Sequence, residues 1–149
     1  MKINKKMSVE DLASEENKEK IKLLKESGFS KKSINYFLNE VNVGKLENAD
    51  VSEMYTGPCG DTMAFYLNIK ENIITNAKFQ AIGCAGAYSS GSALTKMIED
   101  KTLNEVREID EKDILEHLGG LPASKIHCAC LALKTLKKTI EKYESEHKI

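Results

Sequence analysis

Long apolar segments and an excess of charge of one sign are both missing from this sequence. It contains no run of about 18 apolar residues, so we expect no helix that spans a membrane. Basic and acidic residues nearly cancel, which leaves a formal net charge of −1 over 149 residues. Nucleic-acid binding calls for a basic face, and this balance gives no support for one. The sequence therefore predicts no membrane and no nucleic-acid partner.

The apolar core of a secretion signal is also missing near the first residues, which read Met1-Lys-Ile-Asn-Lys-Lys. We therefore expect a cytoplasmic protein. Cysteine is scarce, with four residues in the chain. A chain of this size needs no disulfide to hold a core, so we interpret the thiols as reduced. The paired knuckles of a zinc finger are absent too, and any site that joins distant cysteines must be assembled by the fold.

The hydrophobic periodicity changes from helical to strand-like and back along the chain. Between about residues 50 and 82, apolar and polar residues alternate, as at Met63, Phe65 and Leu67, which predicts a meander of three antiparallel strands. Helical patterns occupy residues 8–27, 30–42, 86–100, 102–105, 110–118 and 124–144. We predict an α+β fold, in which a small antiparallel three-stranded sheet packs against several helices, including a long C-terminal one.

The first predicted helix is highly charged and has only a thin apolar stripe. Such a segment either forms an arm that docks on a partner or packs on the domain behind it, and the sequence leaves both possibilities open. We predict a helical N-terminal extension, residues 1–28, and one domain, residues 29–149.

Three cysteines stand beside glycine, proline or histidine at boundaries between predicted elements. Cys59 lies in a turn between two strands, and Asp61 follows it at a distance that lets both reach one ion. Cys84 lies where a strand gives way to a helix, and a helix N-terminus favours the thiolate that binds metals. Cys128 follows His127 near the start of the last helix and gains similarly. This pattern favours a metal site made of three thiols, an imidazole and a carboxylate.

Each of these residues, taken alone, is also compatible with a purely structural role. A single buried cysteine is usually a small hydrophobic residue, and an aspartate after glycine is usually a turn former. Core filling accounts poorly for the same surroundings at three separate boundaries. We therefore favour the metal site.

Cys130 does not fit this site. Residues 128 and 130 of a helix project about 200° apart, so they do not readily bind one metal ion. We predict that Cys130 is not a ligand, with an auxiliary thiol as the alternative. His117 and His147 lie on exposed helical patterns, and we interpret both as surface residues.

Together these motifs resemble the IscU/NifU-like family of iron–sulfur cluster assembly scaffolds. The motifs are Pro58-Cys-Gly-Asp61, Gly83-Cys84 before a helix of small residues, and Leu121-Pro122 followed by Lys125-Ile-His-Cys128. Their order and spacing agree with the family over about residues 29–143. The resemblance identifies residues 29–149 as an iron–sulfur scaffold domain of the stand-alone, N-terminal type.

The resemblance implies that Cys59, Cys84 and Cys128 are the cluster thiolates, and that Asp61 and His127 are labile or alternative ligands. It also implies a scaffold or carrier rather than an enzyme. Such a protein receives sulfur from a cysteine desulfurase, takes up Fe²⁺, builds a transient [2Fe-2S] cluster and passes it to recipient apo-proteins. Cys128 is the implied persulfide acceptor, and Zn²⁺ can occupy the same site.

Two other functions are consistent with the residues. One is a zinc-bound acceptor of persulfide sulfur that builds no cluster. That branch of the family typically lacks the histidine and carries an insertion before the last cysteine, so His127 and the uninterrupted spacing favour the scaffold. The other is a structural zinc-binding adaptor, which would unfold when the metal is removed.

Leu121, Pro122 and Lys125 are the implied partner-docking residues. The family segment typically reads Leu-Pro-Pro-Val-Lys, whereas this chain reads Leu121-Pro-Ala-Ser-Lys125. The changed middle leaves an Hsp70-type chaperone open as a partner.

Overall fold

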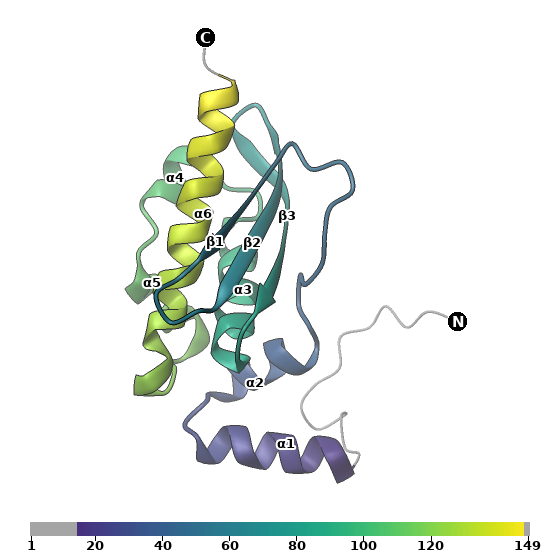
Figure 1. Ribbon diagram of the computed structural model, residues 1–149, viewed down its shortest axis with the longest axis vertical. Helices are drawn as coiled ribbons and strands as arrows, with labels where there is room; N and C mark the ends of the chain where they lie inside the picture. The colour runs from purple at the N-terminus through teal and green to yellow at the C-terminus, as the bar shows by residue number, and fades with distance from the viewer. Residues whose placement is uncertain (1–14, 148–149) are drawn as a thin grey trace, which may run out of the picture.

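The computed structural model of the protein describes residues 15–147, which form one antiparallel sheet with helices against it (Figure 1). The strands are β1 (Val51–Thr56), β2 (Thr62–Lys70) and β3 (Ile73–Ile82), in the order β1-β2-β3. The predicted meander is therefore confirmed. Its inner face is apolar because alternate residues of β2, such as Met63 and Phe65, are fully buried.

The helices are arranged so that two of them start at the same end of the sheet. α3 contacts β3, and α6 contacts β1 and β2. Both begin near the loop that joins β1 to β2 (Figure 1). The helices are α1 (Glu15–Glu26), α2 (Lys31–Leu38), α3 (Ala85–Ile98), α4 (Leu103–Arg107), α5 (Glu111–Leu118) and α6 (Ile126–Glu146), with a 3₁₀ turn at Ala123–Lys125. The predicted α+β fold with its long C-terminal helix is confirmed.

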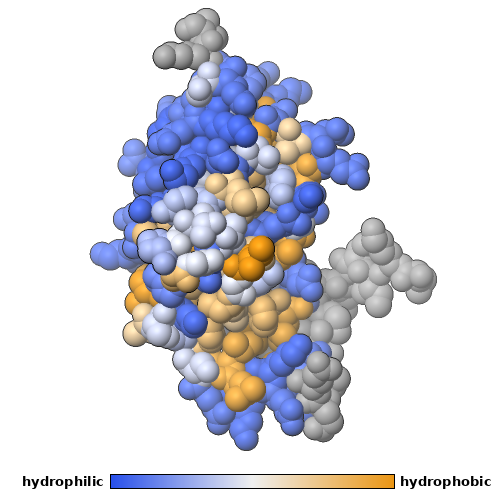
Figure 2. Space-filling view, in the orientation of Figure 1, coloured by the Kyte–Doolittle hydropathy of each residue, from blue (hydrophilic) through white to orange (hydrophobic). Residues whose placement is uncertain are grey.

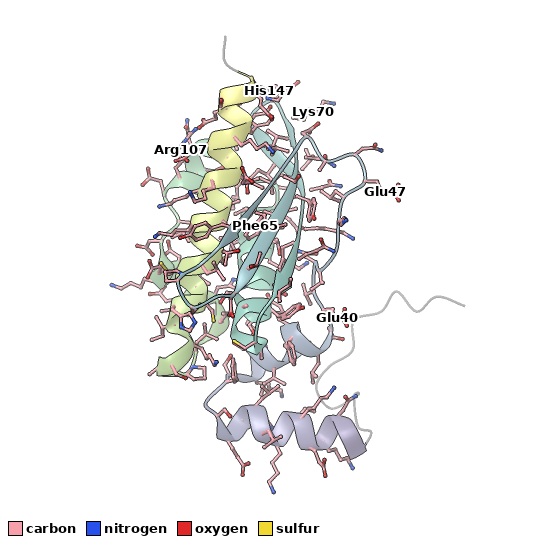
Figure 3. The ribbon with its side chains drawn as sticks, in the orientation of Figure 1. Glu40, Glu47, Phe65, Lys70, Arg107 and His147 are labelled. Atoms are coloured by element: carbon pink, nitrogen blue, oxygen red, sulfur yellow. The ribbon has the colours of Figure 1, made fainter. Side chains whose placement is uncertain are left out.

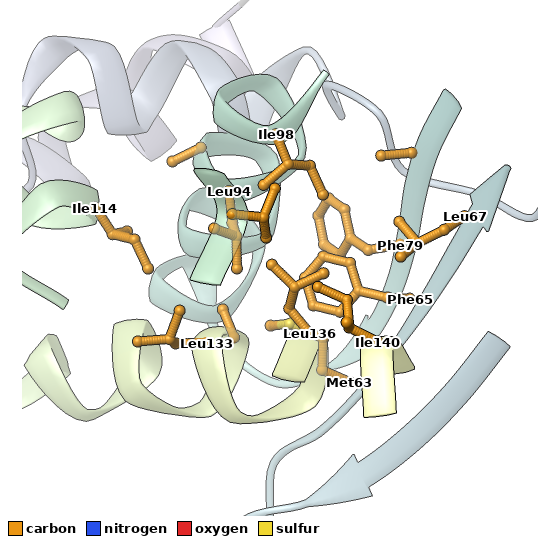
Figure 4. Packing of buried hydrophobic residues seen from close by; sticks show 14 of the residues in the cluster. Met63, Phe65, Leu67, Phe79, Leu94, Ile98, Ile114, Leu133, Leu136 and Ile140 are labelled. Carbon is orange, nitrogen blue, oxygen red and sulfur yellow. The ribbon is translucent and has the colours of Figure 1, made fainter. Parts of the chain in front are cut away.

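The core lies between the sheet and these two helices (Figure 4). Phe65 and Phe79 of the sheet meet Leu94 of α3 and Leu136 of α6, and all four side chains are fully buried. Gly91 of α3 makes this approach possible, because a Cβ atom there would overlap the ring of Phe79. A small residue at this position therefore sets the distance between α3 and the sheet.

Side-chain caps fix where the shorter helices begin. Ser30 caps α2 by accepting a hydrogen bond from the backbone N–H of Ser33 at 3.0 Å. Thr102 and Glu105 form a capping box at the start of α4, and Asp110 caps α5. The last helix begins two residues later than the pattern predicts, because the 3₁₀ turn precedes it.

The described part of the N-terminal extension packs on the domain. Ile21 and Leu24 of α1 lie against the buried residues Phe29 and Ile34. The predicted start of this helix at residue 8 lies outside the described residues, and the boundary at residue 28 stays a prediction. No helix within residues 15–147 has the length and apolar character needed to cross a membrane.

His117 corrects the expectation of a surface residue. Its ring is half-buried and stacks on Tyr36, with the ring centroids 5.8 Å apart. The Tyr36 hydroxyl lies 2.8 Å from His117 Nε2, so this pair joins α2 to α5. The periodicity missed the contact because it depends on how α2, which is far away in the sequence, packs beside α5.

Candidate metal centre

The loop between β1 and β2 presents Cys59 and Asp61 at the edge of the sheet. Thr56 and Thr62 face each other across the ladder, and their hydroxyl oxygens lie 2.7 Å apart at the base of the loop. Inside it, the N–H of Gly57 donates to the carbonyl of Asp61 at 2.9 Å. The turn therefore holds a carboxylate close to an exposed thiol.

Two glycines give this loop its course for different reasons. Gly60 has φ +93°, in the left-handed region that side chains rarely adopt. At Gly57 a Cβ atom would come within 3.1 Å of Leu131 Cδ1 on α6, so that position needs a close approach. The loop thus lies directly against the helix that carries Cys128.

Cys84 occupies the N-cap position of α3 in an extended conformation. Burial has the largest single influence on the pKa of this thiol and disfavours the thiolate. Hydrogen bonds from the backbone N–H groups of Ala87 and Gly86 act in the opposite direction. With smaller effects from Cys128 and Lys125, they lower the pKa of Cys84 overall. The Cys84 thiol therefore loses its proton more readily than an ordinary cysteine thiol does.

Cys128 lies in the first turn of α6 and is fully buried. Its Sγ is 3.9 Å from Cys84 Sγ. Burial, followed by the charges of Cys84 and Asp61, raises the pKa of Cys128 to about 12. The two sulfurs thus ionise unequally, since one thiolate opposes a second beside it. A cation between them would remove that opposition and favour both thiolates.

All five predicted donors meet at this end of the fold. One ligand atom from each of Cys59, Asp61 and His127 lies within 4.8 Å of the others, and the same holds for Asp61, Cys84 and Cys128. Asp61 belongs to both groups. His127 Nε2 also lies 3.7 Å from Cys128 Sγ. The structure therefore brings together residues from two loops and one helix start, as the sequence motifs led us to expect.

Space for a ligand comes from Gly83 and Gly86, two glycines to which the sequence motifs gave no role. A Cβ atom at Gly83 would lie 2.8 Å from Asp61 Oδ2. At Gly86 it would lie 3.0 Å from Cys128 Sγ and 3.5 Å from Cys84 Sγ. The Gly-Cys-Ala-Gly sequence is the signal that could have revealed them. The donor set, three soft sulfurs with imidazole and carboxylate, suits zinc, iron or a small iron–sulfur cluster.

Cys130 lies in neither group of donors. It lines a neighbouring cavity of about 210 Å³ together with Cys59, His127 and Lys134. Burial, and then a hydrogen bond with Glu111, raises the pKa of the Cys130 thiol. Its placement beside α5 agrees with the opposite projection of positions 128 and 130.

The proposed docking residues lie at the edge of the site. Leu121 and Pro122 are half-buried, and Leu121 packs against the cluster formed by Phe29 and Ile34. Lys125 is near the thiols, since a Cβ atom at Gly86 would meet Lys125 Cβ at 3.1 Å. Their role in docking stays a prediction.

Comparison with known proteins places this geometry in a family. The model for the NifU-like N terminal domain matches residues 28–149. Iron-sulfur cluster assembly scaffold protein IscU 1 of Archaeoglobus fulgidus is 41% identical over 116 residues, which cover 77% of this chain and 76% of that protein. IscU of Escherichia coli is 38% identical over 123 residues, which cover 79% and 95%.

A solved structure agrees on the fold. The crystal structure of an N-terminal NifU-like protein from Brucella abortus superposes with a TM-score of 0.66 at 16% identity, covering 82% of this chain and 98% of that one. With the family match over most of its length and relatives near 40% identity, the chain belongs to the NifU-like N-terminal domain family.

Proposed function

We propose that this protein is a scaffold on which an iron–sulfur cluster is assembled from iron and sulfur and then handed to apo-proteins. The observation that carries the proposal is the shared carboxylate of Asp61, which lies among three thiols and belongs to both groups of donors. Curated relatives that carry the scaffold name span most of this chain. The protein is a carrier of its cargo rather than a catalyst.

The donor set suits temporary holding. Iron–sulfur clusters kept permanently by electron carriers usually have four thiolates. Here the candidate set is Cys59, Cys84 and Cys128 with Asp61, and a hard carboxylate binds a soft cluster less firmly than a thiolate does. Cys59 lies on an exposed turn, so the outer side of the cargo can be reached by a recipient.

Sulfur would enter as a persulfide from a cysteine desulfurase. The thiolate of Cys128 attacks the outer sulfur of the donor persulfide, a new S–S bond forms, and the donor leaves as a thiolate. Burial of Cys128 makes the order of events important, because the thiolate is favoured only after Fe²⁺ has bound beside it. We therefore place iron binding before sulfur transfer.

Docking of the donor and recipients would use the end of the molecule that holds the site. On the face seen in Figure 2, hydrophobic residues gather in the lower half, where the β1–β2 loop lies, and hydrophilic residues cover the upper part. Ile126, beside the ligand His127, is 40% exposed. Leu121, Pro122 and Lys125 border the same region, and we propose them as contacts.

Anaerobic loading with Fe²⁺, cysteine and a cysteine desulfurase tests the proposal. The expected result is the visible absorption of a [2Fe-2S] cluster, lost when Cys59, Cys84 or Cys128 is replaced by alanine. Cys130→Ala is the matched control and should keep the absorption. Tightly held Zn²⁺ with no cluster absorption would contradict the scaffold and favour a zinc-bound sulfur acceptor.

A further inference from the structure

One buried hydroxyl group in the described residues has no hydrogen-bond partner, and it belongs to Ser90 of α3. The hydroxyl groups of the nearby serines Ser89 and Ser92 both make hydrogen bonds. Ser89 donates to the carbonyl of Ser33 at 3.1 Å and to that of Ala85 at 2.7 Å. Ser92 donates to the carbonyl of Val41 at 2.7 Å. An unpaired buried hydroxyl destabilises a fold, so a compensating role is expected for it.

Helical geometry places Ser90 on the face of α3 that meets the metal centre. It lies one turn after Gly86 and on the same face of α3. That face contacts the site, because a Cβ atom at Gly86 would lie 3.0 Å from Cys128 Sγ. Side chains of a helix lean toward its N-terminus, so the Ser90 side chain extends in the direction of Gly86.

The Ser90 hydroxyl also makes no hydrogen bond to the backbone of its own helix. Serine and threonine inside a helix commonly bond to the carbonyl four residues earlier, as Ser89, Thr135 and Thr139 do here. Ser90 makes no such bond to Gly86. A neutral thiol is a weak acceptor, whereas a thiolate is a strong one. A metal-bound thiolate in the loaded site would therefore be a stronger partner for this hydroxyl than the neutral thiol is.

We propose that Ser90 is a positioning residue whose hydroxyl donates a hydrogen bond to the sulfur of Cys128 once that sulfur is a metal-bound thiolate. This inference rests on the proposed function and names a residue that acts through one of its ligands. The bond fixes the orientation of the sulfur and reduces the electron density that it donates to the metal, as hydrogen bonds to metal ligands do.

Anaerobic titration of the apo-protein with Co²⁺ tests the bond, with Ser90→Ala compared with wild type and with Ser92→Ala. In Ser90→Ala we expect about tenfold weaker Co²⁺ binding, the effect of losing one hydrogen bond to a charged group. The thiolate-to-cobalt absorption should shift to lower energy, because the sulfur becomes a stronger donor. Ser92→Ala, which lies on the side of α3 that contacts Val41, should change neither.

Urea unfolding of the same apo-proteins separates this role from a structural one. Ser90→Ala should be at least as stable as wild type because it loses no hydrogen bond, while Ser92→Ala should be less stable. An unchanged cobalt spectrum and affinity in Ser90→Ala, or a loss of stability equal to that of Ser92→Ala, would overturn the inference alone. Failure of the wild-type protein to give any thiolate-to-cobalt absorption would overturn the proposed function instead.

Discussion

At the scale of single residues, Asp61 is the side chain that we propose makes this site release its metal. Its carboxylate is the donor shared by the outer group, which holds exposed Cys59 and His127, and the inner group, which holds buried Cys128. A hard oxygen beside soft sulfurs is the weakest link to a cluster. The rate at which cargo leaves should therefore depend on this side chain.

Replacing Asp61 with alanine should slow cluster release, since it removes the ligand that exchanges most readily. The measurement is the half-time of absorption loss from the loaded protein in the presence of an iron chelator. Glu47→Ala removes an exposed carboxylate on the loop before β1 and serves as the control (Figure 3). Faster loss of the cluster from Asp61→Ala than from wild type would refute this role.

The unequal environments of the thiols give a second expectation at this scale. In the apo-protein, two thiols should react with iodoacetamide first: Cys59, because it is exposed, and Cys84, because its pKa is lowered. Cys128 should react last, because it is buried and its pKa is raised to about 12. Peptide mapping by mass spectrometry follows each site at about pH 7.5, below the ordinary pKa of a cysteine thiol. Alkylation of Cys128 as fast as Cys84 would show that the apo site is open.

At the scale of elements, two glycines of α3 allow close contacts with two different parts of the protein. Gly91 faces the ring of Phe79 in the core, and Gly86 faces Cys128 Sγ in the site. Gly91→Ala should lower the free energy of unfolding by about 2 kcal/mol, because overpacking outweighs the gain in helix propensity. Gly86→Ala should instead impair cluster loading with less effect on unfolding.

Urea unfolding and anaerobic loading of both variants check this separation. Each variant is the control for the other, since both add one methyl group to the same helix. Equal losses of stability from the two substitutions would mean that Gly86 and Gly91 do not act separately on the metal site and on the core.

The link between α2 and α5 gives the protein a titrating contact. Burial, and then the positive charge of Lys32, lowers the pKa of His117 below its usual value. The unfolded chain therefore binds a proton first as the pH falls below about 6.5. Stability from the neutral ring is present above that pH and is lost below it, until the folded protein also becomes protonated.

We expect the free energy of unfolding to fall between about pH 7 and about pH 5, where histidine titrates, and to fall less steeply in His117→Gln. Glutamine keeps a polar partner for the Tyr36 hydroxyl but does not titrate. Urea titrations at a series of pH values give the two slopes. Identical slopes would assign the pH dependence to other groups.

At the scale of the whole molecule, much of the fold could be predicted because local signals were unambiguous. The alternation in β2 and the helical periodicity of residues 110–118 are read directly from neighbouring residues. The contact between His117 and Tyr36 could not be, since it depends on how two helices far apart in sequence pack. The pattern of apolar residues within one helix shows that a face is buried, but it does not identify the element that packs on that face.

The site shows the same division. The meeting of its candidate donors could be predicted because cysteines that stand beside glycine and histidine at several element boundaries seldom serve only to fill a core. The tasks of Gly83, Gly86 and Ser90 depend on distances between α3, α6 and the β1–β2 loop, which no single stretch of sequence contains. The fold alone brings these three segments to one end of the sheet (Figure 1).

The central claim is that the cluster is held in order to be passed on, and a transfer assay tests it most directly. The protein is loaded anaerobically, separated from free iron and sulfide, and mixed with an apo-ferredoxin in the presence of an iron chelator. We predict that the ferredoxin gains the cluster spectrum while the scaffold loses its own and the chelator captures little iron. A cluster that stays on this protein, or whose iron goes to the chelator while the ferredoxin stays apo, would contradict the account.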